Sequence, residues 1–301
     1  MPEETQASPP LDPSALTTEQ NTPPSRGRRV ARFGWRVLRV YLLICLVLFF
    51  AQGFLLFPRD RTPARLPATA SQDRVEEVTF TTDDGLELSA WFHRGSSDLS
   101  VIFFPGNGGN REHRYEFLQL VASQGASVLQ VEYRGYGGNP GRPSEAGLYR
   151  DAEAAVAWAQ KNTTGPLVFY GESLGTGVAI EMARRHRPVG VVLHASYSSI
   201  PDVARRTLLV FPTGLICRHR FESAEKIGAI DTPFLFFHGS RDRVIPQRFG
   251  ARLFQAARGK KDWVVIPNAG HSDLWFVDAA RYFGRLRIFF EEELRGDASD
   301  R

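Results

Sequence analysis

Short runs of consecutive apolar residues alternate with amphipathic stretches through most of the chain after residue 75. The runs cover residues 101–104, 128–131, 167–170, 191–193, 234–237 and 263–266. Because they are short and not interrupted at every second position by polar residues, they predict strands buried on both faces of a parallel sheet. The clearest helical patterns lie at residues 144–160 and 249–257. This alternation predicts an α/β fold with a mostly parallel central sheet and helices on both faces.

A hairpin is expected before the first of these strands. Residues 78–80 and 86–88 flank Asp84-Gly85, a dipeptide typical of tight turns between antiparallel strands. The pattern therefore predicts an antiparallel pair of strands at the beginning of the folded domain.

A longer apolar segment lies near the N-terminus. Residues 40–57 are 18 residues that are apolar apart from Gln52 and Gly53, and the segment extends back to residue 37. This length is close to the minimum for crossing a hydrocarbon core of roughly 30 Å. A cleavable signal peptide has the same order of basic and apolar residues. The long preceding segment and the lack of a small-residue cleavage pattern favour an uncleaved transmembrane signal anchor over residues 37–57.

The net charge is +4, and its distribution is more informative than its size. Six arginines lie directly before the apolar segment: Arg26, Arg28, Arg29, Arg32, Arg36 and Arg39. Because basic residues concentrate on the cytoplasmic side of a span, they predict a single-pass membrane protein with a cytoplasmic N-terminus and an extracytoplasmic domain. Their position beside an apolar segment, rather than across a folded face, argues against a nucleic-acid partner.

The composition also divides the chain into parts. The 301 residues suffice for one sizeable core. Residues 1–27 are rich in Pro, Thr, Ser and Glu and predict a disordered tail, whereas residues 75–295 predict the folded domain. Cys45 lies in the apolar segment and Cys217 stands alone in the domain, so neither a disulfide nor a cysteine-bound metal is expected.

The candidate chemistry begins at Gly171-Glu172-Ser173-Leu174-Gly175, which follows one predicted strand and precedes a helical pattern. The pentapeptide predicts a sharp turn that lifts the Ser173 hydroxyl above the sheet, with glycines where a side chain would not fit. The first N–H groups of the following helix favour a developing negative charge. We therefore expect Ser173 to be a nucleophile.

A carboxylate and a histidine follow two later strands. Asp242 comes shortly after residues 234–237, and His271 shortly after residues 263–266. A serine needs a base to take its proton, and the base needs an anion to orient it, so the order Ser173, Asp242, His271 predicts a catalytic triad of the α/β-hydrolase type. The alternative residues are Asp262 and Asp273 for the carboxylate, and His113, His194 and His238 for the base. Neither aspartate ends a strand in the right place, and His113 begins a helix. His238 and His194 also end strands, but we expect His238 to be structural, in the turn leading to Asp242, and His194 to line the site.

Two N–H donors are needed for the tetrahedral intermediate. The backbone N–H of Leu174 follows the nucleophile, and the glycine-rich loop after residue 104 brings Asn107 as the second donor of an oxyanion hole. A nucleotide-binding loop is a poor alternative, because no Lys-Ser or Lys-Thr follows and the glycine spacing does not fit.

These motifs together resemble the α/β-hydrolases, in particular a membrane-anchored, bud-emergence-type serine hydrolase subgroup related to depalmitoylases and lysophospholipid lipases. The matching stretches, between about residues 75 and 294, are residues 105–110, 133–137, 141–148, 171–175, 238–242 and 270–271. One departure is Pro105, where such proteins usually carry histidine. The resemblance implies that Tyr133-Arg134-Gly135 shapes a loop under the site and is structural rather than catalytic.

The substrate is less clearly indicated. A lid is expected at about residues 195–232, and its apolar stretch, residues 207–216, predicts either packing over the core or a mouth that admits acyl chains. The leading hypothesis is a serine hydrolase that cleaves small-molecule or lipid-like acyl esters or thioesters through an acyl-enzyme, without a metal or organic cofactor. An aminopeptidase-like amide hydrolase and a non-catalytic membrane-tethered binding protein are the alternatives. The oligomeric state stays open.

Overall fold

The computed structural model describes residues 26–294 and divides the chain between Leu46 and Val47 into two units. The first helix, α1 (Arg26–Leu56), runs through this boundary. Among the described residues it is the one helix long and apolar enough to cross a membrane. It begins inside the predicted tail, so residues 26 and 27 are helical, while residues 1–25 of that tail lie outside the described part.

Phe57 does not continue the apolar helix as the sequence pattern suggested. Its side chain is buried and belongs to the hydrophobic core beside the sheet. The last residue of the predicted span is therefore an anchoring point of the folded domain.

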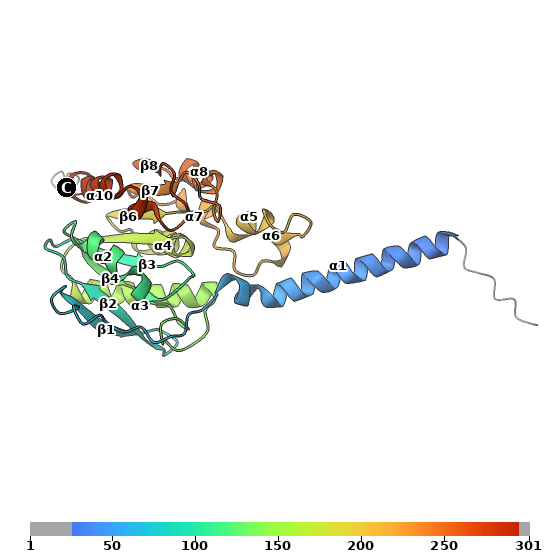
Figure 1. Ribbon diagram of the computed structural model, residues 1–301, viewed down its shortest axis with the longest axis horizontal. Coiled ribbons are helices and arrows are strands. Elements are labelled where there is room, and N and C mark those ends of the chain that lie inside the picture. Colours follow the sequence, from blue (N-terminus) through green and yellow to red (C-terminus); the bar gives the residue numbers. More distant parts are fainter. Residues whose placement is uncertain (1–25, 295–301) are drawn as a thin grey trace, which may run out of the picture. The chain divides into compact units, whose positions relative to one another are not determined.

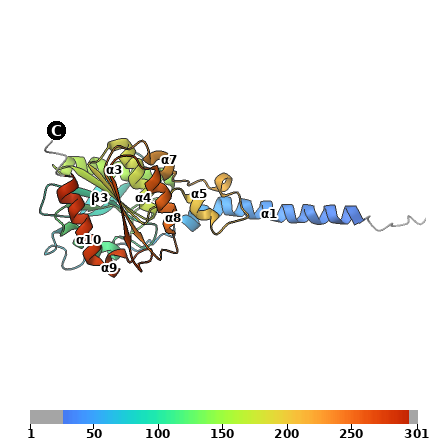
Figure 2. The same cartoon turned by 90° about the horizontal axis from the view of Figure 1, so that it is seen from above.

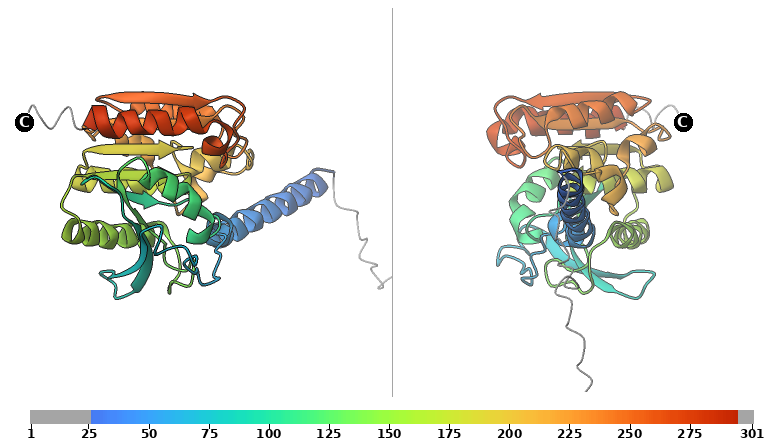
Figure 3. Two further views of the ribbon diagram at one scale, coloured as in Figure 1. Left: turned by 60° about the vertical axis from the view of Figure 1, so that its left-hand side comes forward. Right: turned by 90° about the vertical axis from the view of Figure 1, so that its right-hand side faces the viewer.

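Eight strands form one sheet in the order β1-β2-β4-β3-β5-β6-β7-β8. They are β1 (Val75–Thr81), β2 (Glu87–His93), β3 (Ser100–Phe104), β4 (Ser127–Gln130), β5 (Leu167–Glu172), β6 (Gly190–His194), β7 (Phe234–Gly239) and β8 (Lys261–Ile266). The first two form the expected antiparallel hairpin, in which Phe80 pairs with Leu88, and β2 is antiparallel to β4. All other neighbours are parallel. Figure 3 shows the hairpin at one edge of the sheet and β8 at the other.

Helices cover both faces of the sheet (Figures 1 and 2). The helical segments after α1 are η2 (Arg111–Arg114), α2 (Tyr115–Ala122), α3 (Glu145–Asn162), α4 (Leu174–His186), α5 (Ile200–Arg205), α6 (Thr213–Ile216), α7 (Ser223–Ile227), α8 (Gln247–Ala256), α9 (Leu274–Val277), α10 (Ala279–Ile288) and the π-helix η3 (Phe289–Glu293).

Alternate residues of each central strand belong to different cores. In β3, Ile102 belongs to the same hydrophobic cluster as residues of α3, α4 and α8, whereas Val101 and Phe103 belong to the cluster that contains residues of α2 and α10. Because successive side chains of a strand point to opposite faces, a strand buried on both sides needs a continuous apolar run. This confirms the doubly covered sheet expected from the sequence.

The loop after β4 is held by a buried ion pair. Arg134 contacts Asp151 of α3 at 2.7 Å and Asp84 of the hairpin turn at 2.7 Å. Ser144 caps the same helix by accepting the Gly147 N–H at 3.0 Å. These contacts connect the hairpin, the loop and α3 beneath the carboxyl ends of the strands.

Candidate active site

Ser173 occupies the sharp turn between β5 and α4. Its φ is +50°, which is unusual for a residue with a side chain, and its N–H donates to the His194 carbonyl at 2.8 Å. The flanking glycines are required by packing, because a Cβ on Gly171 would lie 2.5 Å from the Thr176 Cα and one on Gly175 would lie 2.0 Å from the Phe104 carbonyl oxygen. The turn thus has the local structure that its sequence predicts.

His271 lies between Ser173 and Asp242. Its Nε2 is 2.9 Å from the Ser173 Oγ, and its Nδ1 is 2.7 Å from the Asp242 Oδ2. The three residues follow β5, β7 and β8 and meet at the carboxyl ends of these parallel strands. The structure therefore brings together the three residues that the sequence selected.

Asp242 is well suited to orient a histidine. Its Oδ1 accepts the N–H groups of Val244 and Ile245 at 2.9 and 2.8 Å, which leaves Oδ2 facing His271. Burial alone would raise the pKa of this carboxyl, but the hydrogen bond and charge of His271 outweigh burial and hold the pKa below its ordinary value. Asp242 is thus kept ionised at the base of the site.

The competing carboxylates have other partners. Asp262 contacts Arg285 at 2.7 Å. Asp273 accepts the Gly270 N–H at 2.6 Å and so shapes the turn that carries His271.

The competing histidines are also engaged elsewhere. His238 is buried, contacts the Ile245 carbonyl through Nε2 at 2.8 Å and stacks on Trp263. His194 lines the cavity, contacts the Tyr282 hydroxyl at 3.0 Å, and burial lowers its pKa to about 4. His113 accepts the Asn110 N–H in a capping box at η2.

The two expected oxyanion donors come from the start of α4 and from the loop after β3. Leu174 is the first residue of α4, where helix N–H groups have no helical partner. Within residues 26–294, neither its N–H nor that of Asn107 has a hydrogen-bond partner. The Asn107 side chain instead donates to the Leu56 carbonyl at 2.7 Å and holds its loop against the end of α1.

An ion pair that the sequence analysis missed supports the same loop. Arg114 Nε contacts Glu172 Oε2 at 2.5 Å, and Arg114 Nη1 donates to the Gly108 carbonyl at 3.0 Å. The carboxylate of Glu172 also accepts the Gly106 N–H at 3.4 Å. Burial would raise the pKa of Glu172, but Arg114 beside it holds the pKa below 4.5. The one available signal was an acidic residue directly before the serine, and nothing in the sequence identified its arginine.

A cavity of about 380 Å³ opens above Ser173 and His271. Its polar wall is the loop around Asn107, and its apolar wall includes Phe117 and Trp275. It can accommodate an acyl group and present its carbonyl carbon to Ser173.

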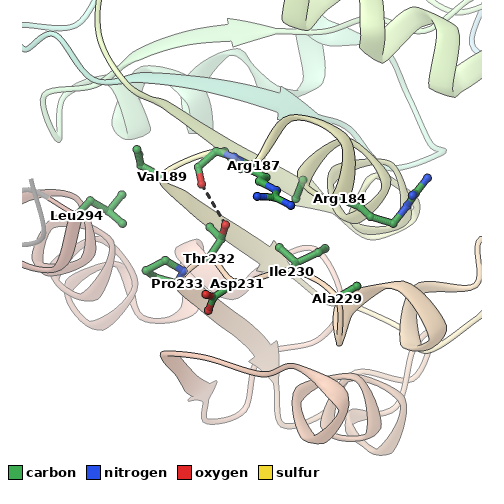
Figure 4. Close-up of a pocket in the computed structure, with 11 residues that line it drawn as sticks. Arg184, Arg187, Val189, Ala229, Ile230, Asp231, Thr232, Pro233 and Leu294 are labelled. Carbon is green, nitrogen blue, oxygen red and sulfur yellow. Dashed lines mark hydrogen bonds between the residues drawn. The ribbon is translucent and has the colours of Figure 1, made fainter. Parts of the chain in front are cut away.

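A larger cavity of about 570 Å³ lies at the opposite ends of the strands, beside the amino ends of β6 and β7 (Figure 4). Arg184, Arg187 and Asp231 line it, and the Thr232 hydroxyl donates to the Pro188 carbonyl at 3.2 Å. Ligands of open α/β sheets bind at the carboxyl ends of the strands, so this larger cavity is not the reaction site.

Comparison with known proteins agrees with this architecture. A family model described as serine aminopeptidase, S33, matches residues 95–219. An uncharacterized protein of Mycobacterium tuberculosis strain H37Rv is 35% identical over 222 residues, which cover 72% of this chain and 79% of the relative. The human alpha/beta hydrolase domain-containing protein 17B is 28% identical over 235 residues, 75% of this chain and 79% of its own.

Solved structures show the same fold at lower sequence identity. The Pyrococcus furiosus esterase Pf2001 aligns with a TM-score of 0.64 and 18% identity over 77% of this chain and 98% of its own. Est1E from Butyrivibrio proteoclasticus, determined with ferulic acid bound, aligns with a TM-score of 0.59 and 18% identity over 70% of this chain and 99% of its own. With its parallel sheet, its serine turn after β5 and these relatives, the chain belongs to the α/β-hydrolase superfamily.

Proposed function

We propose that this protein is a membrane-anchored serine hydrolase that cleaves carboxylic acyl esters or thioesters. The observation that carries the proposal is the position of His271, whose two ring nitrogens contact the Ser173 hydroxyl and the Asp242 carboxylate. A serine hydroxyl becomes a strong nucleophile when a base removes its proton, and a carboxylate orients that base and stabilises its protonated form.

In the first half of the reaction, the Ser173 oxygen attacks the carbonyl carbon of the substrate while its proton moves to His271 Nε2. The carbonyl oxygen becomes an oxyanion that the N–H groups of Leu174 and Asn107 stabilise. When the intermediate collapses, the bond to the leaving group breaks and His271 donates its proton to the departing alkoxide or thiolate. The product is an acyl-enzyme on Ser173.

In the second half, a water molecule gives its proton to His271 and attacks the acyl carbon. The same two N–H groups stabilise the second oxyanion. When this intermediate collapses, the bond between the acyl carbon and the Ser173 oxygen breaks, His271 returns its proton to that oxygen, and the carboxylic acid is released. The mechanism requires donors fixed before the reaction begins, because preorganised dipoles need no rearrangement as charge develops. The support of the Asn107 loop by Leu56 and Arg114 is consistent with this requirement.

The charges around the cavity favour esters over aminoacyl amides. Among the described residues that line it, Glu172 is the only carboxylate, and it is paired with Arg114. The α-ammonium group of an aminopeptidase substrate would therefore lack an anionic partner there. The aminopeptidase description of the family model keeps amide hydrolysis as the competing reaction.

The membrane part of the proposal rests on α1. This helix contains 31 residues, and its apolar part runs from Val40 to its last residue, Leu56. A helix of this length and composition can cross a bilayer as an uncleaved signal anchor.

Covalent labelling tests the proposed chemistry. The full-length wild-type protein should react with a fluorophosphonate probe, and Ser173→Ala should remove labelling while thermal stability is retained. Ser272→Ala is the matched control, because Ser272 lines the same cavity and should leave labelling intact. Labelling that persists in Ser173→Ala would assign the nucleophile to another residue.

A substrate panel then separates the reactions. Acyl p-nitrophenyl esters of increasing chain length and matching thioesters should turn over faster than aminoacyl p-nitroanilides. The reverse ranking would establish the amide hydrolase. An intact protein that neither reacts with the probe nor turns over any substrate would instead be a binding protein on a hydrolase scaffold.

A further inference from the structure

Gln52 is the polar exception in the apolar part of α1, and it is bonded to the connection between β6 and β7. Its Nε2 donates to the Ile216 carbonyl at 3.1 Å, and its Oε1 accepts the Arg218 N–H at 2.5 Å. Residues from Val47 onward belong to the same unit as the sheet, so these contacts lie within one unit. An unpaired amide would be costly in a bilayer, and the backbone at residues 216–218 satisfies it.

These contacts show which part of α1 the β6–β7 connection lies beside. The apolar sequence ends at Phe57, and charged residues begin at Arg59. A helix rises 1.5 Å per residue, so Gln52 lies about 6 Å along the axis before Leu56, the last residue of α1. The chain around Ile216 therefore lies at a level where α1 is still apolar.

Three large apolar side chains of the same connection are exposed. Leu209, Val210 and Leu215 are 78%, 73% and 84% exposed, respectively. A groove of about 500 Å³, lined mainly by apolar side chains such as Leu48, Leu55 and Leu208, separates this connection from α1. Exposed large apolar side chains gathered on one connection favour an interaction site there.

Exposed basic side chains flank these apolar residues in the sequence. Arg205 and Arg206 precede them, and Arg218 follows with its guanidinium 5.5 Å from the Phe49 ring. Long cationic side chains can cover apolar surface while their charged ends reach phosphate groups at the membrane interface. Apolar tips with arginines beside them fit a phospholipid surface better than a purely apolar partner.

We infer that residues 207–216 insert into the outer part of the bilayer beside α1, with Leu209, Val210 and Leu215 among the acyl chains and the neighbouring arginines at the phosphates. The partner is the phospholipid bilayer itself. The hydrolase domain is thereby held at the membrane at two places. One is the end of α1, and the other is the segment of residues 207–216, which we call the apolar tip. This inference rests on the membrane anchoring proposed above and adds a second contact to it.

The test uses the full chain in vesicles of phosphatidylcholine and phosphatidylglycerol. In a Cys45→Ser, Cys217→Ser background, single cysteines are labelled with an environment-sensitive NBD fluorophore at the apolar tip (Leu215→Cys), in α1 (Phe50→Cys) and at a control site. The control is Leu120→Cys on α2. Leu120 is 40% exposed, and α2 covers the face of the sheet opposite to the face that α3 and α4 cover. Vesicles containing doxyl-labelled lipid then report contact with acyl chains.

We expect blue-shifted emission and loss of most fluorescence to doxyl lipid at positions 50 and 215, and neither effect at position 120. Quenching at position 50 without quenching at 215 would overturn the inference and leave the anchor intact. Absence of quenching at position 50 would overturn the proposed anchor and this inference together. Fluorophosphonate labelling of each variant checks that the domain is folded.

Discussion

Two carboxylates lie near His271: Asp242 contacts its ring, and Asp273 shapes the turn that carries it. Substitutions of the two should differ in their effect on turnover. Asp242 contacts His271 Nδ1 at 2.7 Å, whereas Asp273 contacts the Gly270 N–H. Asp242→Asn replaces the acceptor by an amide that favours the wrong histidine tautomer, so turnover should fall on the order of 10⁴-fold. Asp273→Asn should lower it far less, as measured by kcat on an acyl ester. The opposite ranking of the two variants would show that the carboxylate is misassigned.

Glu172 is expected to position, through Arg114, the glycine-rich loop after β3 that carries Asn107. Glu172→Ala removes the partner of Arg114 and the acceptor of the Gly106 N–H, so the Asn107 N–H should be less well placed. Because displaced donors weaken binding of the transition state more than of the substrate, kcat should fall roughly tenfold or more with a smaller change in KM. Glu172→Gln should retain part of the activity, since its amide oxygen still accepts from Arg114.

The matched control for this prediction is Glu76→Ala, which breaks the exposed ion pair with Arg94 at the sheet edge. It should leave kcat and KM unchanged. Thermal unfolding of Glu172→Ala measures how much of the variant is folded. If its activity falls only in proportion to the amount of folded protein, Glu172 has only a structural role.

At the scale of elements, the segment after β4 is built around a buried carboxyl group. Glu132 is 3% exposed and accepts the Arg111 N–H at 2.7 Å. Gly137, with a φ of +55°, passes so close that a Cβ there would lie 2.3 Å from the Glu132 Oε2. The backbone of this segment therefore packs directly against the carboxyl group, where a larger residue would not fit.

This carboxyl group should make stability depend on pH. Burial raises the pKa of Glu132 from 4.5 to about 7. The folded protein thus binds this proton more tightly than the unfolded chain, so its contribution to stability is fully present below about pH 4.5 and is lost as the pH rises toward 7. The contribution is on the order of 3 kcal/mol. Glu132→Gln has no group that titrates at this position, so it should not show this pH-dependent loss of stability. The difference in Tm, variant minus wild type, should therefore become more positive from pH 5 to pH 8.

Thermal unfolding of the full chain in detergent across this pH range measures the effect. Glu77→Gln is the control, because Glu77 is a half-exposed carboxylate that contacts the side chain of Arg111, whereas Glu132 accepts the backbone N–H of the same residue. Parallel curves of Tm against pH for Glu132→Gln and the wild type would contradict the role assigned to Glu132.

At the scale of the whole molecule, the arginine distribution predicts the orientation in the membrane. Six arginines precede residue 40, and the close basic residues after the apolar segment are Arg59, Arg61 and Arg65. Because this rule counts basic residues, a phosphatase that is active only outside the cytoplasm should be active when fused after Arg301. The fusion should also stay in the membrane after a carbonate wash.

Two other results would change this assignment. An inactive phosphatase in a retained fusion would place the hydrolase domain in the cytoplasm. A shortened product released by the wash would show that the apolar segment is a cleaved signal peptide.

Much of the fold follows from the sequence because strand and helix patterns are local. The runs at residues 101–104 and 234–237 lie within β3 and β7, and the pattern at residues 144–160 coincides with most of α3. The turn at Ser173 was also predictable, since glycines on both sides of a residue with positive φ are a local requirement. The limits of the lid and of the folded domain remain predictions from the sequence.

Other features were decided only by the tertiary structure. The pairing of Glu172 with Arg114 joins residues 58 positions apart, and the bond from Gln52 to Ile216 joins residues 164 apart. Phe57, the last apolar residue of the predicted span, became part of the core. A local pattern specifies which face of an element is apolar and where its chain can turn, because these depend on the neighbouring residues alone. It does not specify which distant side chain satisfies a charge or an amide, since that choice depends on how all the elements pack together.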